Sequence, residues 1–374
     1  MKLIIEEVLN KKSLKKFIQF QLNLYKSNEF WVPPLISDEI KTLSKDKNPA
    51  FEFCESKLWM VLKDDKVVGR VAGIINHKFN EKVNKKYARF GWIDFIDDYT
   101  VSELLLSTVE NWAKEKGMEY INGPLGFTDM DGEGLLVEGF DQLSTFGSIY
   151  NFPYYPQHLE RFNYKKDSDW IEFRIELEQT IPDKVFRIAE IVKQKEKLKV
   201  VDVKKSKDLL PYARQIFYLI NEAYRDLYGF VELNDKQIDM YVKSYFGFIK
   251  PGFVPLVVNE KNELVAFGIS MPSLSKAMKN AKGKYLPFGI IHLLKALRSN
   301  DTADLYLTAV KPELQNKGVN AIIMCEINKA FLKNNIRFVE TNRELEDNTK
   351  IQSQWRYYNA VQHKRRRCYI KNIF

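Results

Sequence analysis

The sequence predicts an α/β protein built from two domains of the same fold, and three observations support that prediction. Two hairpin patterns far apart in the chain are alike, at 58–74 and 253–269; each is a β-rich run, a polar turn and a second β-rich run ending near a glycine. Each is followed by an apolar-striped helix and a strand, at 100–123 and 318–341. The chain has 374 residues, more than one ordinary core accommodates, so a duplicated fold accounts for both the length and the repeat.

The domain boundaries follow from the order of these elements. Each half opens with a strand and a helix, at 2–25 and 198–224, and each closes with a helix and a strand. The halves meet near 176–185. We therefore predict one domain over 1–176 and a second over 186–374.

An overlay of the two helix and strand segments supports the repeat at the level of single residues. Without gaps, Gly117 coincides with Asn335, and both stand where a helix end favours a left-handed residue. The apolar positions coincide as well: Leu104, Leu105 and Val109 fall on Ile322, Ile323 and Ile327.

Composition narrows the class of protein. Apolar residues make up 45% of the chain and charged residues 29%, which is typical of a globular protein. The start, MKLIIEEVLN, lacks the continuous apolar core of a signal peptide, and no apolar run approaches the ~20 residues of a membrane span, so we expect a soluble, cytoplasmic protein. Three scattered cysteines and four scattered histidines give no disulfide framework and no zinc pattern, and we predict no metal site.

The formal net charge is +9, and the densest basic run is His363 to Arg367. Two interpretations remain open for this run. It is either the solvated edge of a hairpin or a contact for a ligand phosphate or a nucleic acid.

A glycine turn between a strand and a helix is the strongest functional feature. The strand Leu305–Val310 is followed by Pro312, by the turn 315–320 and by a long helix. A helix start carries unpaired N–H groups and a partial positive charge, so it favours an anion. Gly318 removes a Cβ that would hold a phosphate away from the backbone. The alternative is an ordinary strand-to-helix turn with a helpful glycine.

The residues of this turn resemble motif A of the GNAT acyltransferase superfamily, Q/R-x-x-G-x-G/A, with Gln315, Gly318 and Asn320 at its defined positions. Downstream, 346–370 is similar to the family's closing helix and last strands, with Asn348 in the asparagine place and Trp355 in the tyrosine place. The resemblance implies an α/β (α+β) fold of two tandem GNAT-like domains, each a mixed, mostly antiparallel sheet flanked by helices.

The resemblance also implies which residues bind acetyl-CoA or another acyl-CoA as co-substrate. They are Leu307, Ala309 and Val310 of the strand, Gln315, Asn316, Lys317, Gly318, Val319 and Asn320 of the turn and helix start, and Asn348. Asp304 falls where some members carry a glutamate base, or else is a solvent-facing strand residue. Because Trp355 has no useful acidity, Tyr358 is the expected proton donor to the leaving thiolate, unless water donates instead.

The first half lacks the same turn. Its equivalent, Asp97 to Ser102, has no glycine and offers two carboxylates where a pyrophosphate would lie. Like charges ~4 Å apart repel by about 4 kcal/mol at an effective dielectric constant of 20. We expect the first domain to keep the fold and not to bind CoA.

The predicted function is therefore N-acyl transfer, acetyl or longer, from acyl-CoA to a small-molecule or peptide amine. The alternatives are a CoA-binding sensor or scaffold without turnover, and a Fem-like transferase that uses aminoacyl-tRNA; the retained CoA-type turn argues against a nucleic-acid partner. Two further segments have open interpretations. The amphipathic segment Lys284–Ser299 is core, a lid, or a contact for an acyl chain or a membrane, and the aromatic residues between Tyr212 and Phe230 are an acceptor wall or ordinary core.

Overall fold

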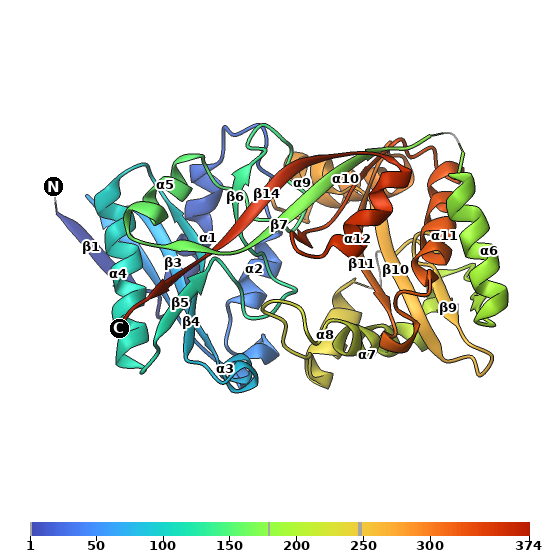
Figure 1. Ribbon diagram of the computed structural model, residues 1–374. Coiled ribbons are helices and arrows are strands. Elements are labelled where there is room, and N and C mark those ends of the chain that lie inside the picture. The colour runs from blue at the N-terminus through green and yellow to red at the C-terminus, as the bar shows by residue number, and fades with distance from the viewer. Residues whose placement is uncertain (1, 179, 246–248) are drawn as a thin grey trace. The chain divides into compact units, whose positions relative to one another are not determined.

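The structure, a computed structural model, describes residues 2–178, 180–245 and 249–374. The chain forms two compact units that interleave in sequence (Figure 1). The first unit contains 1–171, 275–290 and 364–374, and the second contains 172–274 and 291–363. Each unit is described by itself below.

The first unit is a mixed sheet that is mostly antiparallel. Its strands are, in sheet order, β1 (Leu3–Glu7), β2 (Cys54–Lys63), β3 (Lys66–Asn76), β4 (Tyr87–Phe95), β5 (Tyr120–Gly123) and the C-terminal end of β14 (Asn359–Asn372), with β6 (Leu135–Glu138) also paired to β14. Only the β4 and β5 pair is parallel.

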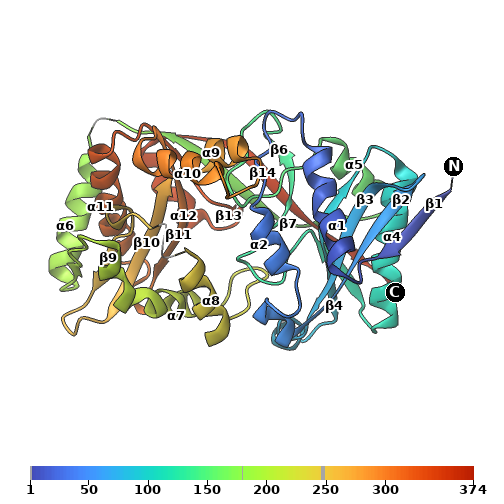
Figure 2. The ribbon, with the colours of Figure 1, turned by 180° about the vertical axis from the view of Figure 1, so that it is seen from behind.

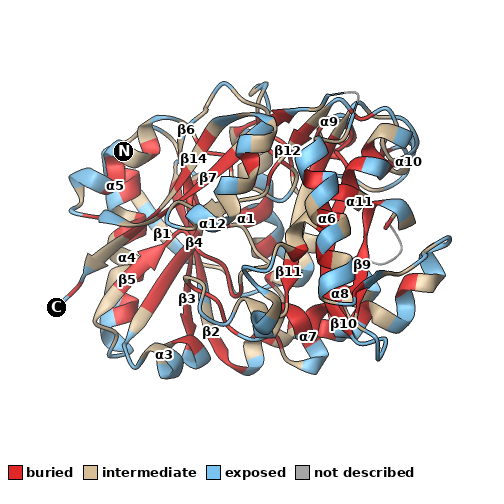
Figure 3. Cartoon of the chain, turned by 45° about the vertical axis from the view of Figure 1, so that its right-hand side comes forward, coloured by how far each residue is buried: buried red, intermediate tan, exposed pale blue. Residues whose placement is uncertain are grey.

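Helices cover both faces of this sheet because its strands alternate apolar side chains. Trp59 and Val61 of β2 pack with α4 on one face, while Leu58, Met60 and Leu62 pack with α1 on the other. The helices of this unit are α1 (Lys11–Leu24), α2 (Ile36–Thr42), α3 (His77–Val83), α4 (Tyr99–Glu115), α5 (Tyr154–Arg161) and α9 (Ser275–Ala281). Figure 3 shows β3 and β4 as largely buried strands.

The second unit repeats the pattern. Its strands are, in sheet order, the C-terminal end of β7 (Lys165–Glu176), β12 (Phe338–Glu340), β11 (Thr302–Val310), β10 (Leu264–Pro272), β9 (Leu256–Val258) and β8 (Lys199–Val200). Here β11 and β12 are the parallel pair, and the other pairs are antiparallel. A short strand, β13 (Glu344–Leu345), follows β12.

The core of the second unit forms where α11 (Val319–Lys333) lies on the sheet. Ile322, Ile323 and Ile327 of α11 are fully buried in one apolar cluster with residues of β10, β11 and β12. The other helices are α6 (Asp183–Lys195), α7 (Ala213–Ala223), α8 (Asp235–Tyr245), α10 (Gly289–Arg298) and α12 (Thr349–Gln352). Figures 1 and 2 both place α6 beside α11, and Val185, Ala189 and Val192 of α6 join the same cluster. Helix α6 was not predicted from the sequence.

The predicted fold class and the internal repeat are confirmed. Both hairpins form, and in each unit a long helix connects the two parallel strands. Gly117 and Asn335 follow the ends of α4 and α11 with φ of 73° and 55°, the left-handed conformation expected of both. The compact units exchange their closing strands, since β7 begins in the first unit and ends in the second, and β14 does the reverse. The division at 1–176 and 186–374 stays a prediction about the duplicated halves.

The basic run at the end of the chain is not a solvated edge, and that interpretation was wrong. Lys364 and Arg366 are fully buried, and Lys364 Nζ donates to Thr145 Oγ1 at 3.2 Å. Arg367 donates two hydrogen bonds, of 2.8 and 2.9 Å, to the buried carboxylate of Asp169. Arg365 donates to Glu138 at 3.1 Å. Most of the charge in this run is therefore used inside the first unit, so the run does not present a row of free cations to a phosphate.

Candidate functional site

The two parallel strands of the second unit separate part of the way along. Their ladder contains three pairs, from Thr302 with Phe338 to Asp304 with Glu340, and then ends. The register of β11 against β10 shifts at Tyr306, because Ser270 pairs with Leu305 and the next residue, Ile269, with Leu307. Beyond Asp304, β11 therefore has an edge that β12 does not cover.

Side chains mark this edge. The amide of Asn342 donates to the carbonyl oxygen of Tyr306 at 2.8 Å. The hydroxyl of Tyr224, just after α7, donates to the carbonyl oxygen of Thr308 at 2.9 Å, and the Thr308 N–H lies 3.4 Å from the same hydroxyl. Tyr224 is one of the aromatic residues noted in the sequence, and the structure places its hydroxyl against β11 rather than only in the core.

At the far end of β11, a turn leads into α11. The short helix η5 (Pro312–Leu314) is followed by three exposed residues, Gln315, Asn316 and Lys317. Gly318 is the N-cap of α11 with φ of 83°, and no side chain caps the helix start. The Ala321 N–H of this turn donates to the Gly318 carbonyl oxygen at 2.9 Å, so the N–H groups that remain for an anion are those at the very start of the helix.

The structure gives a different reason for the glycine than access for a phosphate. A Cβ on Gly318 would lie 3.2 and 3.3 Å from the side chains of Val192 and Ile188 in α6. The positive φ and this close approach both require glycine. Lys317, the one cation of the turn, has its Nζ 3.2 Å from Glu196 Oε2 just beyond α6. The turn and α6 thus form one packed element.

Other residues predicted to bind the cofactor are in the same element. Gln315 Nε2 donates to the carbonyl oxygen of Val310 at 3.1 Å and so closes the turn. The Oδ1 of Asn320, in the first turn of α11, is buried without a hydrogen-bond partner among the described residues. An amide can rotate to present its N–H₂ group instead, so this position fits a phosphate oxygen.

At the other end of the splayed strand lies a group of polar residues. Asp304 is only 1% exposed, and the hydroxyl of Tyr306 donates to its Oδ2 at 3.2 Å. Its neighbour across the ladder is Glu340, whose Oε2 is 2.8 Å from His363 Nε2. Asp304 is therefore not a solvent-facing residue, because its carboxylate is buried. Its role as a base stays a prediction.

The closing segment differs from the single closing helix that the resemblance implied. It consists of α12, which Asn348 caps through a 3.4 Å hydrogen bond from the Ile351 N–H, and a 3₁₀ helix, η6 (Ser353–Tyr357). Tyr358 follows η6 in an extended conformation, so its direction cannot be derived from helical periodicity. Asn328 of α11 donates to its hydroxyl at 2.8 Å, and burial raises the pKa of Tyr358 to about 12.

Trp355 contacts Glu344, a residue that was not predicted from the sequence. Its indole N–H lies 3.0 and 3.1 Å from the two carboxyl oxygens of Glu344. Burial raises the pKa of Glu344 to about 7, although the hydrogen bond from Trp355 lowers it. No sequence pattern marks Glu344, because its neighbours are also charged and its burial comes from the closing segment folding over it.

In the first unit the corresponding features are already occupied. Asp98 caps α4 by accepting from Thr100 N at 3.0 Å and Thr100 Oγ1 at 2.6 Å, and these bonds help hold its pKa below the ordinary value. Oδ1 of Asp97 lies 3.0 Å from Nε2 of His158, and the two atoms form a hydrogen bond. The Leu125 N–H donates to the carbonyl oxygen of Phe90 at 2.9 Å, so the chain itself covers the edge of β4. This helix start has a carboxylate where an anion would bind.

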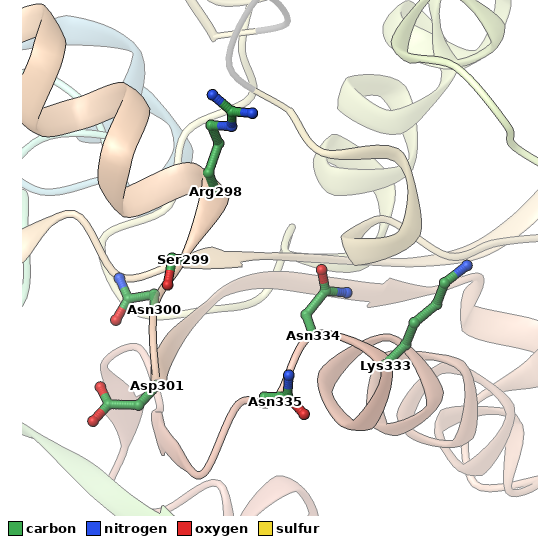
Figure 4. A pocket seen from close by; sticks show the side chains of 7 residues that line it. All are labelled: Arg298, Ser299, Asn300, Asp301, Lys333, Asn334 and Asn335. Atoms are coloured by element: carbon green, nitrogen blue, oxygen red, sulfur yellow. The ribbon is translucent and has the colours of Figure 1, made fainter.

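A hollow of about 590 Å³ lies elsewhere in the second unit (Figure 4). It is lined by Arg298, Ser299, Asn300, Asp301, Lys333, Asn334 and Asn335. These residues gather at the C-terminal end of α11 and the start of β11, and 15 residues at 1.5 Å each place that end roughly 22 Å from the helix start. The hollow is therefore separate from the glycine turn.

The predicted site residues lie on three parts of the second unit. Leu307 to Asn320 form a continuous strand, turn and helix start, while Asp304 lies about 20 Å from Val310 along the strand, at ~3.3 Å per residue. Asn348 and Tyr358 belong to the closing segment. Among the residues that the structure describes, no group of three His, Cys, Asp or Glu residues could hold a metal ion. Nor does any described helix have the length and apolarity to cross a bilayer.

Comparisons with known proteins show which sequences and folds this chain is similar to. No family model matches the sequence. Protein YghO of Escherichia coli K12 is 27% identical over 379 residues, covering 99% of this chain and 95% of that protein. The bacterial ceramide synthase of Caulobacter vibrioides is 26% identical over 310 residues, covering 81% of this chain and 79% of that protein. Among solved structures, a tandem GNAT protein from the clavulanic acid biosynthesis pathway matches with a TM-score of 0.57 at 11% identity, over 100% of this chain and 99% of that chain.

Proposed function

With its tandem GNAT-like fold as the premise, we propose that this protein is an N-acyltransferase that moves an acyl group from an acyl-CoA to the nitrogen of an amine. The observation that carries the proposal is the uncovered edge of β11 leading through a short turn to the uncapped start of α11. The strand edge offers peptide groups to a ligand that displaces the Asn342 and Tyr224 side chains bonded to the Tyr306 and Thr308 carbonyl oxygens, and the helix start offers its first N–H groups. A long donor with a thioester at one end and phosphates at the other matches this arrangement.

The binding residues divide according to the parts of the donor. Leu307, Ala309 and Val310 flank the extended arm that carries the thioester, and the peptide groups that can pair with this arm belong to alternate residues of the strand, since those of Leu307 and Ala309 face β10. The phosphates lie at the turn and the first residues of α11, which are Gln315, Asn316, Lys317, Gly318, Val319 and Asn320. The buried Oδ1 of Asn320 without a partner supports a ligand at this helix start. Asn348 contributes by fixing the start of the closing segment.

Acyl transfer to an amine requires a base. The amine nitrogen attacks the thioester carbon, the carbon–sulfur bond breaks, and the nitrogen loses a proton. We assign this role to His363, whose Nε2 lies 2.8 Å from Glu340 Oε2 next to the point where the strands separate. Asp304 is the alternative base, since it neighbours Glu340 at the point where the strands separate.

The leaving sulfur has to take up a proton. An ordinary thiol has a pKa of ~8.5. The carboxyl of Glu344, with a pKa of about 7, can donate to such a thiolate without a large energetic penalty. Tyr358, with a pKa of about 12, holds its proton more tightly, so it acts more readily as a hydrogen-bond donor. We assign the proton donor to Glu344 and a positioning role to Tyr358.

The acceptor class comes from a relative. The Caulobacter protein is named a ceramide synthase, and a ceramide is an N-acylated long-chain amino alcohol. The similarity covers 81% of this chain, which includes at least part of both units. We therefore propose an amine with a long hydrocarbon chain as acceptor and a long-chain acyl-CoA as donor.

Turnover is tested with the purified full-length chain, palmitoyl-CoA and sphinganine, with the N-acylated product and free thiol measured by mass spectrometry and a thiol reagent. The proposal predicts one amide formed per thiol released, and losses in His363→Gln and Glu344→Gln. Butylamine in place of sphinganine tests the chain requirement. Binding of acyl-CoA without release of thiol would instead favour a sensor or scaffold, and copurifying RNA with strong salt dependence would favour a tRNA-dependent enzyme.

A further inference from the structure

A helical segment inserted between β10 and β11 has a surface that the acyl-transfer chemistry does not use. The segment leaves the sheet after Pro272 and returns at Thr302, and its ends are joined by a 2.9 Å hydrogen bond from Ser273 N to the Thr302 carbonyl. Asn300 Nδ2 adds a second bond, of 2.7 Å, to the Ser273 carbonyl. The insertion is therefore anchored where it begins and ends.

Four large apolar side chains of this insertion face solvent. Phe288 is 71% exposed, Leu286 67%, Ile291 59% and Leu294 52%. Isolated exposed apolar residues are ordinary, but these four lie within nine residues, and the helical ones share a face of α10. Leu293, on the other side of α10, is buried and holds the helix in place. Figure 3 shows exposed turns of α10.

The insertion itself carries charges of one sign only. Between Ser273 and Asn300 the sequence has no Asp or Glu, and it has six cations: Lys276, Lys279, Lys282, Lys284, Lys295 and Arg298. At 100° per residue around the axis of α10, Lys295 lies about 40° from Ile291, and Arg298 lies about 40° from Leu294. Apolar and basic side chains therefore share one exposed face.

We propose that the exposed face of α10 formed by Ile291, Leu294, Lys295 and Arg298 docks on the surface of an anionic lipid bilayer, and that Lys284, Leu286 and Phe288, which directly precede the helix in the sequence, add exposed side chains to this contact. Exposed Phe and Leu side chains enter the boundary of the acyl chains, while Lys and Arg contact the lipid phosphates. A protein partner would need matching carboxylates, whereas a bilayer supplies negative charge and apolar depth together. The inference rests on the proposed function, since an acceptor with a long hydrocarbon chain resides in a bilayer rather than in water.

The test is co-sedimentation of the full-length protein with vesicles of phosphatidylcholine alone and of phosphatidylcholine with phosphatidylglycerol. Wild type should bind the anionic vesicles, and added salt should weaken binding. Phe288→Asp with Ile291→Asp should reduce binding about tenfold or more, because two apolar side chains that would enter the bilayer are lost. Lys295→Gln with Arg298→Gln should reduce binding to anionic vesicles and leave the weak binding to neutral ones unchanged.

Ile191→Asp is the matched control, because Ile191 is 62% exposed on α6 and lies outside the insertion. This variant should bind vesicles like wild type. Equal binding by wild type and the Phe288 and Ile291 variant, or no binding by wild type, overturns the proposal. A wild-type dimer that becomes monomeric in that variant, without vesicle binding, assigns the face to a second copy of the chain and also overturns it.

Titration of palmitoyl-CoA separates this inference from the proposed function. The docking variants should bind palmitoyl-CoA as wild type does, because none of the changed residues belongs to the strand, turn or helix start of the donor site. Donor binding without vesicle binding refutes the docking surface alone. Vesicle binding without donor binding refutes the acyl-CoA proposal and leaves the surface in place.

Discussion

Replacing Glu344 with Gln should change how the stability of the protein depends on pH. Glu344 is partly buried beneath the closing segment, and both of its oxygens lie within 3.1 Å of the indole N–H of Trp355. Burial raises its pKa from 4.5 to about 7. Gln keeps the shape and the oxygen that accepts from Trp355, and it removes the ionisation.

The sign and size of the effect follow from proton linkage. An acid whose pKa is higher in the folded protein binds more protons there than in the unfolded chain, so its favourable contribution is complete below pH 4.5 and is lost as the pH rises through 7. A shift of roughly 2.5 units at 1.36 kcal/mol per unit gives about 3 kcal/mol. Relaxation of the surrounding residues reduces this, and we expect about 2 kcal/mol.

The assay is urea denaturation of wild type and Glu344→Gln at several values between pH 4.5 and 8.5, monitored by tryptophan fluorescence. The free energy of unfolding of wild type should fall by about 2 kcal/mol relative to the variant across this range, with the change centred between pH 5 and 7. Tyr358→Phe serves as control, because its hydroxyl does not titrate there. Parallel pH curves for wild type and Glu344→Gln would refute the argument that the folded protein holds this carboxyl protonated.

Three further predictions concern packing, a buried ion pair and the edge of β11. Gly318→Ala should destabilise the protein by about 2–3 kcal/mol, because its φ is positive and its Cβ would meet α6, whereas Gly117→Ala, with no atom within 4 Å of the added Cβ, should lose only about 1 kcal/mol in thermal denaturation; equal losses would contradict the α6 contact. Asp169→Asn should lower the free energy of unfolding by about 2–4 kcal/mol, since it leaves Arg367 without its two charge-assisted hydrogen bonds, and an unchanged urea midpoint would show that the basic run is solvated after all. Tyr224→Phe should cost about 1 kcal/mol of stability without weakening acyl-CoA binding, because the Tyr224 hydroxyl occupies a strand position that the donor arm would take; weaker binding in a calorimetric titration would show that this hydroxyl holds the donor instead.

The fold could be predicted from the sequence because its signals are local and occur twice. The apolar stripe and left-handed end of α11 repeat those of α4, so Asn335 could be identified from Gly117. The turn before α11 was also readable, since Gln315 and Gly318 stand at fixed spacing. These features depend on residues a few positions apart.

The rest of the site depends on contacts between distant segments, which one sequence does not reveal. His363 at the start of β14 lies beside Glu340 of β12 although the two strands are separate in the sequence, and Glu344 is buried where Trp355 of the closing segment lies against it. The basic run was misinterpreted for the same reason, as its partner Asp169 lies on β7, far away in the sequence. Glycine at 318 was predicted to give a phosphate access to the backbone, which stays a prediction, and the contact with α6 that also requires glycine could not be foreseen.

The central claim is that the start of α11 holds the phosphates of an acyl-CoA, and calorimetric titration of palmitoyl-CoA tests it most directly. Asn320→Asp places a carboxylate in the first turn, where repulsion from a phosphate ~4 Å away amounts to about 4 kcal/mol before screening. Asn335→Asp makes the same change at the opposite end of the helix, at an exposed left-handed position that Asp tolerates. We predict one site per chain, at least tenfold weaker binding in Asn320→Asp, and unchanged binding in Asn335→Asp. No binding by wild type, or equal affinities for all three proteins, would contradict the claim.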